Sequence, residues 1–347
     1  MVTEVSAVKN NTYIIAEISA NHNGSLESAI QLISEAKRAG ADAVKIQTYT
    51  ADTLTLDSDN EYFRIEGGTL WDGRTLHNLY HEAHTPWDWH HEIFASAKKE
   101  GIECFSTPFD ETAVDFLEQF DPPYHKVASF ELTHHPLLVK IARTGRPVIM
   151  STGMGSREEI QESVGLLRKN GCGDITLLKC TSSYPAPLDE ANLARIPEMA
   201  HRYGVRAGLS DHTMGFIAPL TAVALGAKVI EKHLCHSRQD PGPDSAFSME
   251  PAEFGEMVVA IRSAESAIGT VSYELTAAEE KSLAFRRSLF YANNLPAGHI
   301  LTTEDVRVVR PAHGLPPSRL HDVVGSTIRR GVTRATPVRE SDISKPA

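Results

Sequence analysis

The feature that most constrains the fold of this chain is a regular alternation of short apolar segments with helical patterns. Eight segments are predicted to be buried strands: residues 13–18, 43–47, 102–106, 125–128, 147–150, 175–179, 205–209 and 228–231. A helical pattern follows each, at residues 26–39, 86–100, 112–120, 135–143, 157–169, 190–203, 216–225 and 252–268. Eight strand–helix units in succession are typical of an α/β fold, the (β/α)8 TIM barrel.

A doubly wound open sheet is the alternative, because it also alternates strands with helices. Its first strand is usually followed by a GxGxxG turn, and residues 21–24 (NHNG) do not provide one. Several predicted helices also begin at plausible caps. Ser156 precedes one of them, and Thr85 stands before Pro86 at the start of another.

Composition excludes several classes of protein. The 347 residues suffice for one large domain and a small one. A net charge of −11 without a dense basic stretch argues against nucleic acid and membrane surfaces as partners. The four cysteines show no CxxC spacing, so reduced thiols in a cytoplasmic protein are expected. Residues 1–11 are polar and lack a signal-peptide core, and no apolar segment is long enough to cross a membrane.

Polar side chains occur at the carboxyl end of every predicted strand, where the active sites of TIM barrels lie. Residues two apart share one face of a strand, so Lys45 should point the same way as Gln47, and Glu231 the same way as His233. Lys126 and Ser129 are three apart, so the strand must bend or end between them. In chain order the polar residues are Glu17, Lys45, Gln47, Ser106, Thr107, Lys126, Ser129, Glu131, Ser151, Thr152, Ser182, Tyr184, Ser210, His212, Glu231 and His233.

His212 and His233 each stand at the end of an apolar strand, beside acidic residues. Imidazole binds several divalent metals, and two such ligands with open positions suit a catalytic metal better than a closed structural one. For either histidine alone, an ordinary hydrogen-bonded side chain is the alternative. The polar residues at the other strand ends favour the metal site.

Two lysines in apolar strands require anionic partners, because burying an unpaired ammonium group is costly. With nearby hydroxyls they form a predicted cradle for a small phosphate or carboxylate, composed of Lys45, Thr107, Lys126, Ser129, Ser151, Ser182 and Ser210. Carboxylates are available at Glu17, Glu131, Glu231 and Asp244. This combination suits carbon–carbon bond formation on a phosphorylated acid, or metal-assisted hydrolysis.

Eight motifs in register resemble those of the sialic acid synthase family, the phosphoenolpyruvate-dependent nonulosonate synthases. They lie at residues 15–24, 45–49, 106–110, 151–154, 180–185, 210–213, 231–233 and 242–244. The resemblance implies condensation of phosphoenolpyruvate with an open-chain N-acetylated amino sugar to a nine-carbon 2-keto sugar acid, with release of phosphate. It also implies a divalent metal, Mn2+ first, with Mg2+ or Co2+ as other candidates.

The resemblance implies a role for each matched residue. His212 and His233 hold the metal, and the seven residues of the predicted cradle bind phosphoenolpyruvate. Glu17 handles protons or stabilises positive charge at C2. Glu231 orients a ligating imidazole, with a structural ion pair to Lys232 or Lys45 as its alternative. The sugar meets Gln47, Glu131, Tyr184, Asp244 and Arg310.

Within the family, the pseudaminic acid branch is the most similar. The similarity lies at residues 68–76, 80, 85–87, 128–133 and 242–248. The expected sugar is therefore 2,4-diacetamido-2,4,6-trideoxy-L-altrose, whose apolar groups Trp71, Phe130 and Phe247 are expected to contact. An N-acetylmannosamine-type sugar, as used by N-acetylneuraminate or legionaminate synthases, is the alternative. The loop 234–241 does not match, so its role at the sugar end stays open.

A separate C-terminal unit is predicted. Residues 1–270 form the synthase domain, residues 271–284 a linker, and residues 285–347 a small domain that resembles the antifreeze-like (SAF, β-clip) domain. So small a unit is near the lower limit of independent stability. The resemblance implies a homodimer in which this domain acts in trans and Arg310 reaches the neighbouring site, whereas a surface arginine is the alternative.

Two other functions stay open. One is a metal-dependent hydrolase or aldolase that does not use phosphoenolpyruvate, which would need neither the two strand lysines nor the many hydroxyls. The other is a non-catalytic sugar-binding scaffold, which would not need Lys45 or the two histidines.

Overall fold

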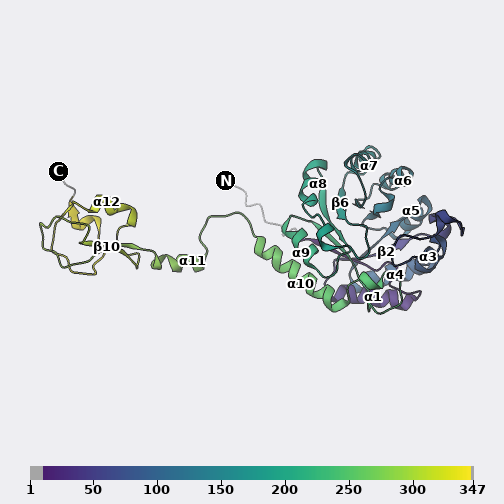
Figure 1. Cartoon of the computed structure of the whole chain (residues 1–347), viewed down its shortest axis with the longest axis horizontal. Helices are drawn as coiled ribbons and strands as arrows, with labels where there is room; N and C mark the ends of the chain where they lie inside the picture. Colours follow the sequence, from purple (N-terminus) through teal and green to yellow (C-terminus); the bar gives the residue numbers. More distant parts are fainter. Residues whose placement is uncertain (1–10, 345–347) are drawn as a thin grey trace. The chain divides into compact units, whose positions relative to one another are not determined.

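The computed structural model describes residues 11–344, which form two compact units divided between Gly269 and Thr270 (Figure 1). The predictions on residues 1–10 and on residues 345–347 lie outside the described part of the chain. Within residues 11–344, no helix is both long and apolar enough to span a bilayer.

The first unit is a closed barrel of eight parallel strands in sequence order, ringed by helices (Figure 1). The strands are β1 (Tyr13–Glu17), β2 (Ala43–Thr48), β3 (Glu103–Pro108), β4 (His125–Val127), β5 (Val148–Ser151), β6 (Ile175–Cys180), β7 (Arg206–Asp211) and β8 (Val229–His233). The helices are α1 (Leu26–Arg38), α2 (Ala51–Leu54), α3 (Leu76–Ala83), α4 (His90–Glu100), α5 (Glu111–Leu117), α6 (His135–Arg143), α7 (Arg157–Lys169), α8 (Arg195–Tyr203), α9 (Ile217–Ala224) and α10 (Pro251–Ile268). The predicted TIM barrel is confirmed.

Two apolar cores explain why these strands are apolar along their length. One lies between the strands and the helices, and the other fills the barrel with Ile15, Ala43, Phe105, Ile149, Leu178 and Val229. Parallel strands buried on both faces are apolar without alternation. Because side chains alternate along a strand, the residue two positions later also faces the barrel interior. Those residues are Glu17, Lys45, Thr107, Ser151, Cys180 and Glu231, which form a polar layer at the carboxyl ends.

The helices differ from the prediction in a few places. Ser156 caps α7 as predicted, and Glu159 completes the cap with reciprocal hydrogen bonds. The predicted cap at Thr85 is wrong, because a 3-10 turn, η2 (Trp87–Trp89), intervenes and α4 begins at His90 without a side-chain cap. Helices α2 and α3 were missed because they span only four and eight residues, too few to show a clear period.

The second unit contains α11 (Ala277–Ser282), β9 (Ser288–Tyr291), β10 (Val306–Val309), α12 (Leu320–Val323), β11 (Thr327–Ile328) and β12 (Ile343–Ser344). Strand β9 pairs antiparallel with β10, and β11 with β12. The second unit has its own apolar core, which includes Leu289, Tyr291, Val323 and Val338. The predicted linker limits at residues 271 and 284 stay a prediction.

Candidate active site

A network of four buried charged side chains lies in the polar layer of the barrel. Lys45 Nζ forms an ion pair with Glu17 and lies 3.6 Å from Oε1 of Glu231. The same Oε1 lies 3.9 Å from Nζ of Lys126. None of the four side chains is more than 5% exposed. The two strand lysines therefore have the anionic partners that their burial requires.

Glu231 bridges the two lysines in this network. It also accepts a hydrogen bond of 3.0 Å from Ser210 Oγ. Of the two ion pairs considered for it, the one with Lys45 is present. Lys232 points the other way, with its Nζ 2.5 Å from Oδ2 of Asp211. The predicted orientation of an imidazole by Glu231 therefore has no hydrogen bond to support it among the described residues.

Hydroxyl groups complete the surroundings of both lysines. Lys45 Nζ donates to Thr107 Oγ1 over 3.1 Å, and Lys126 Nζ donates to Ser151 Oγ over 2.8 Å. Each hydroxyl comes from a neighbouring strand, so barrel closure brings donors and acceptors together. An incoming anion would meet two ammonium groups with hydroxyl donors beside them, which is a favourable setting for a phosphate or carboxylate.

Two further serines of the predicted cradle converge on Gly153. A Cβ atom at this glycine would lie 2.2 Å from Ser182 Oγ and 2.7 Å from Ser129 Oγ, so any larger residue would displace them. The Gly153 amide donates to Ser129 Oγ over 3.1 Å. Strand β4 ends at Val127, and Ser129 begins the 3-10 turn η4 (Ser129–Glu131), which confirms the predicted strand end.

The charges in the network shift one another's pKa values. Burial raises the pKa of Glu17 to about 7, although Lys45 opposes the shift. Burial alone would lower the pKa of Lys45, but Glu17 and Glu231 raise it above its ordinary value. Burial lowers the pKa of Lys126. Glu17 is therefore a carboxyl group able to exchange a proton near neutral pH.

His212 and His233 lie side by side at the ends of β7 and β8, with ring centroids 5.4 Å apart. His212 Nδ1 is 2.9 Å from the carbonyl oxygen of Thr181, and His233 Nδ1 is 3.2 Å from Ser19 Oγ. A carbonyl oxygen only accepts, so His212 Nδ1 carries a hydrogen, and Nε2 is the ring nitrogen left for a metal. Burial lowers the pKa of His233 well below its ordinary value, which favours the neutral, metal-binding form.

These two imidazoles fit a divalent metal that keeps open coordination positions. Their Nδ1 atoms are engaged by oxygen atoms, as is usual for metal-ligating histidines. Among residues 11–344, no group of three or more His, Cys, Asp or Glu side chains is arranged to hold a metal. The chain therefore offers two nitrogen ligands here.

Aromatic rings line one side of the histidine pair. The ring centroid of Tyr184 is 4.3 Å from that of His212, 5.1 Å from Phe247 and 5.6 Å from Trp71. Phe130 does not join them, and its side chain is 63% exposed. Of the three aromatic residues expected to contact the sugar, two therefore lie at this wall.

The remaining predicted sugar-binding residues have different surroundings. Glu131 has a buried Oε2 without a hydrogen-bond partner among the described residues, and burial raises its pKa to about 7 although Lys126 opposes this. Gln47 is half-buried and pairs in register with Thr107. Burial raises the pKa of Asp244, although polar and charged neighbours oppose the shift. Arg310 belongs to the second unit.

In the loop 234–241, the side chains of His236 and Arg238 contact helices α1 and α10. His236 Nδ1 lies 2.8 Å from Oε2 of Glu35 in α1, and Arg238 Nη2 lies 2.8 Å from Oε1 of Glu253 in α10. These two side chains hold the loop in place and do not face the polar layer.

The predictions from the sequence did not include three features of the site. Cys180 faces the barrel interior, 3.9 Å from His212 Nδ1, and its position two residues after Leu178 was the available signal. Ser19 contacts His233 as described above. The ion pair between Asp211 and Lys232 lies beside both histidines in sequence, and no local pattern identifies it.

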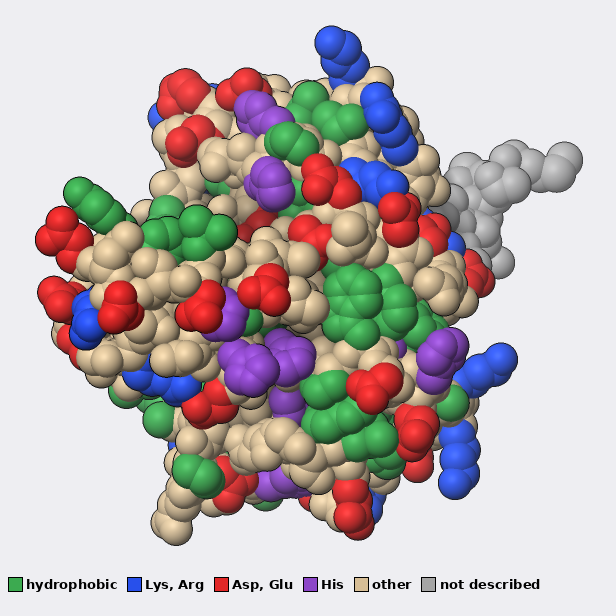
Figure 2. All heavy atoms as spheres, turned by 90° about the vertical axis from the view of Figure 1, so that its right-hand side faces the viewer, with side chains coloured by type: hydrophobic (Ala, Val, Ile, Leu, Met, Phe, Trp, Pro, Cys, Tyr) green, Lys and Arg blue, Asp and Glu red, His purple; other side chains and the backbone are tan. Residues whose placement is uncertain are grey.

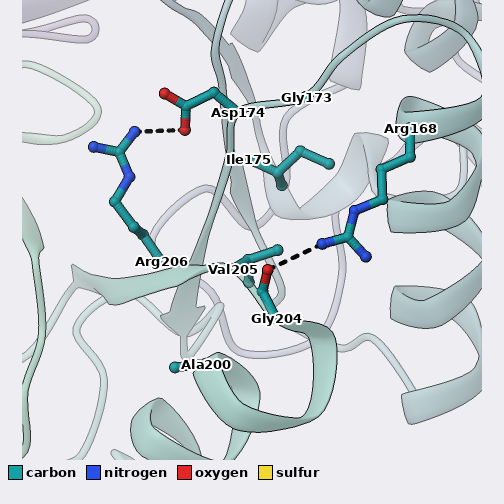
Figure 3. Close-up of a pocket in the computed structure, with 8 residues that line it drawn as sticks. All are labelled: Arg168, Gly173, Asp174, Ile175, Ala200, Gly204, Val205 and Arg206. Atoms are coloured by element: carbon teal, nitrogen blue, oxygen red, sulfur yellow. Dashed lines mark hydrogen bonds and ion pairs between the residues drawn. The ribbon is translucent and has the colours of Figure 1, made fainter.

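Other polar features lie apart from the site. A cavity of about 400 Å³ lies at the amino ends of β6 and β7, where Arg206 pairs with Asp174 over 2.7 Å and Arg168 bonds the carbonyl oxygen of Gly204 over 3.0 Å (Figure 3). It is therefore at the end of the barrel opposite the polar layer.

Histidines also gather with acidic side chains on a surface of the barrel (Figure 2). On and next to α3, the ring centroids of His77 and His81 are 6.4 Å apart, and those of His81 and His84 are 5.7 Å apart. His77 lies 3.1 Å from Oδ1 of Asp52. Unlike His212 and His233, His81 is exposed.

Comparison with known proteins places this geometry in context. Residues 32–273 match the NeuB family, and residues 286–344 match the SAF domain. A pseudaminic acid synthase of Campylobacter jejuni is 44% identical over 95% of this chain and 96% of that protein. One of Helicobacter pylori is 40% identical over 96% of this chain and 98% of that protein. The crystal structure of an N-acetylneuraminic acid (sialic acid) synthetase from Leptospira borgpetersenii, in complex with citrate, is 32% identical, with a TM-score of 0.71 over 79% of this chain and 91% of that one.

Proposed function

The chain belongs to the NeuB family, and from this premise we propose that it is a pseudaminic acid synthase. It is a carbon–carbon bond-forming transferase that condenses phosphoenolpyruvate with 2,4-diacetamido-2,4,6-trideoxy-L-altrose, giving pseudaminic acid and phosphate. Synthases of this family are generally metal-dependent, and we propose Mn2+ as the metal.

The observation that carries this proposal is the buried network of Lys45, Glu17, Glu231 and Lys126 with its surrounding hydroxyls. The two buried ammonium groups provide the positive charge that binds an anionic substrate. A hydrolase with two histidines does not require them, and a sugar-binding scaffold would gain nothing from burying them.

Phosphoenolpyruvate would occupy this polar layer. Lys45 and Lys126 would bind its phosphate and carboxylate, with hydroxyl donors from Thr107, Ser129, Ser151, Ser182 and Ser210. Bound in this way, the enol carbon C3 faces the sugar aldehyde and forms the new bond. Water then adds at C2, and the bond from C2 to the phosphate oxygen breaks to release phosphate.

Glu17 would stabilise the positive charge that develops at C2 or transfer a proton there. Its carboxyl group forms an ion pair with Lys45, and burial raises its pKa to about 7. His212 and His233 would hold the metal, which polarises the aldehyde when bound. Gln47, Glu131, Tyr184 and Asp244 would orient the sugar. The rings of Tyr184 and Phe247 shield the histidine pair from water on one side.

Phosphate release in the presence of Mn2+ tests the proposal. The assay compares 2,4-diacetamido-2,4,6-trideoxy-L-altrose with N-acetylmannosamine as the sugar. We expect a higher kcat/KM for the first, since this ratio measures differential binding of the transition state. Each correctly buried methylene-sized group favours the right sugar by about 0.8 kcal/mol. Equal or better use of N-acetylmannosamine would assign the chain to the neuraminate branch. No phosphate release with either sugar would contradict the reaction itself.

We further propose a homodimer in which the SAF domain of one subunit closes the barrel of the other, with Arg310 contacting the N-acyl group. Large apolar side chains are exposed on the loops that follow β4, β5 and β7, the side of the barrel that carries the site. Phe130, Met154 and Met214 are 63%, 64% and 51% exposed. Apolar surface of this kind favours coverage by a partner.

Mixed dimers of two inactive variants test the exchange. Arg310→Ala and Lys45→Ala should each be inactive, and one intact site should appear in the heterodimer. Recovered phosphate release supports action in trans, whereas confirmed heterodimers without recovery mean that each SAF domain closes its own barrel.

We place the reaction in the cytoplasm, in keeping with four buried cysteines that form no disulfide.

A further inference from the structure

Trp71 connects three loops at the carboxyl end of the barrel. It lies in the loop between α2 and α3, which follows β2, and its indole Nε1 donates to the carbonyl oxygen of Pro243 over 3.1 Å. Pro243 belongs to the loop after β8. The ring centroid of Trp71 also lies 5.6 Å from that of Tyr184, which belongs to the loop after β6. One side chain therefore joins three loops that are far apart in the sequence.

The topology of the barrel shows that the ring contact crosses its mouth. In a closed barrel of eight strands in sequence order, β2 and β6 stand on opposite sides. A contact between the loops that follow them therefore passes over the carboxyl end, where the polar layer lies. Pro243 directly precedes Asp244, and both Asp244 and Tyr184 are proposed to orient the sugar. Trp71 thus lies at the sugar end of the site.

The segment that carries Trp71 is otherwise loosely attached. Residues 58–75 form a hairpin with internal hydrogen bonds, such as the one from the Gly68 amide to Asp72 Oδ2 over 2.8 Å, and Arg74 ties its base to α3. None of residues 58–75 is buried. Among the described residues, the indole of Trp71 makes the one hydrogen bond between this hairpin and the loops after β6 and β8. A segment with so little buried surface opens at low cost in free energy.

We propose that residues 58–75 form a lid over the sugar end of the site and that Trp71 latches this lid to the carbonyl oxygen of Pro243. The inference deepens the proposed function and rests on it for the identity of the sugar. The open lid admits the open-chain sugar. The closed lid excludes water and holds Tyr184 and the loop of Asp244 in place. Trp71 is therefore a positioning residue that acts through these two neighbours.

Two variants separate the hydrogen bond from the ring. Trp71→Phe removes the indole donor and keeps an aromatic ring, whereas Trp71→Ala removes both. Trp87→Phe is the matched control, because Trp87 is also half-buried and its Nε1 also donates to a backbone carbonyl oxygen, that of Tyr49, over 3.2 Å. Each variant is compared with the parent as full-length protein.

Trypsin cleavage after Arg64 reads the state of the lid without any substrate. Arg64 is exposed within the hairpin, and cleavage of a segment that must first open tracks the population of the open form. One hydrogen bond of ordinary net strength corresponds to a factor of about 2–10 in that population. We therefore expect cleavage about 2–10-fold faster in Trp71→Phe, faster still in Trp71→Ala, and unchanged in Trp87→Phe. Equal rates in all four proteins would overturn the latch.

Phosphate release then tests the connection to the sugar. We expect KM for the sugar to rise about 2–10-fold in Trp71→Phe, while KM for phosphoenolpyruvate stays as in the parent. Trp87→Phe should match the parent in both constants. An equal rise of both constants in Trp71→Phe, or a rise of neither, would overturn the role at the sugar end. If the parent releases no phosphate, the proposed function fails, and the cleavage rates still decide whether Trp71 latches the lid.

Discussion

The ion pair between Asp211 and Lys232 should be the most sensitive charged contact on the outer face of the barrel strands. The two side chains are 2% and 1% exposed, and Oδ2 lies 2.5 Å from Nζ. The backbone amide and the hydroxyl of Thr213 also donate to the Asp211 carboxylate, over 3.0 and 3.1 Å. Removing either charge would leave the other buried with no opposite charge beside it.

We therefore expect Asp211→Asn and Lys232→Met each to reduce the free energy of unfolding by about 3–5 kcal/mol, the cost of leaving one charge of a buried pair alone. The double variant removes both charges at once. It should cost about as much as one single variant, which gives a coupling free energy of about 3–5 kcal/mol in a double-mutant cycle.

Urea unfolding at 25 °C measures the four proteins of the cycle. Arg202 and Glu198 provide the control pair, because they also form an ion pair but are 44% and 36% exposed. Their coupling should be far smaller, because exposed ion pairs contribute little to stability. A coupling between Asp211 and Lys232 as small as that of the control pair would refute the reasoning.

Three further outcomes are expected. Chelation of the metal should abolish phosphate release, and His212→Ala or His233→Ala should give folded protein with little bound Mn2+ by elemental analysis; full turnover after chelation would contradict the assignment. Burial raises the pKa of Glu131 from 4.5 to about 7, so its contribution to stability is present below pH 4.5 and is lost as the pH rises through 7. Urea unfolding of Glu131→Gln should therefore match the parent near pH 4.5 and exceed it by at most about 3 kcal/mol at pH 8; equal curves at both pH values would count against a raised pKa. Gly242→Ala should lower the unfolding free energy by about 1–3 kcal/mol, because the new Cβ would lie 2.1 Å from Asn23 Oδ1; an unchanged midpoint in urea would show that Asn23 moves aside freely.

The barrel and most of the polar layer could be predicted from the sequence because both depend on local patterns. Strands buried on both faces must be apolar, and side chains that share a face repeat every two residues. Lys45 and Glu231 therefore stood out as charges at the ends of apolar segments. Phe130 shows the limit of this reasoning. Resemblance to the family predicted that its ring contacts the sugar, but it did not reveal that the residue is exposed.

The partners of these charges were decided by tertiary structure. Lys45 and Lys232 both lie in apolar strands, but one faces Glu17 inside the barrel and the other faces Asp211 outside it. The chain has 16 histidines, and its local sequence alone does not say which two meet. Ser19 and His233 are 214 residues apart, and they meet because closure of the barrel pairs β1 with β8. The sequence by itself determined which residues are polar at each strand end, whereas closure of the barrel determined which of them touch, because those contacts join strands that no local pattern connects.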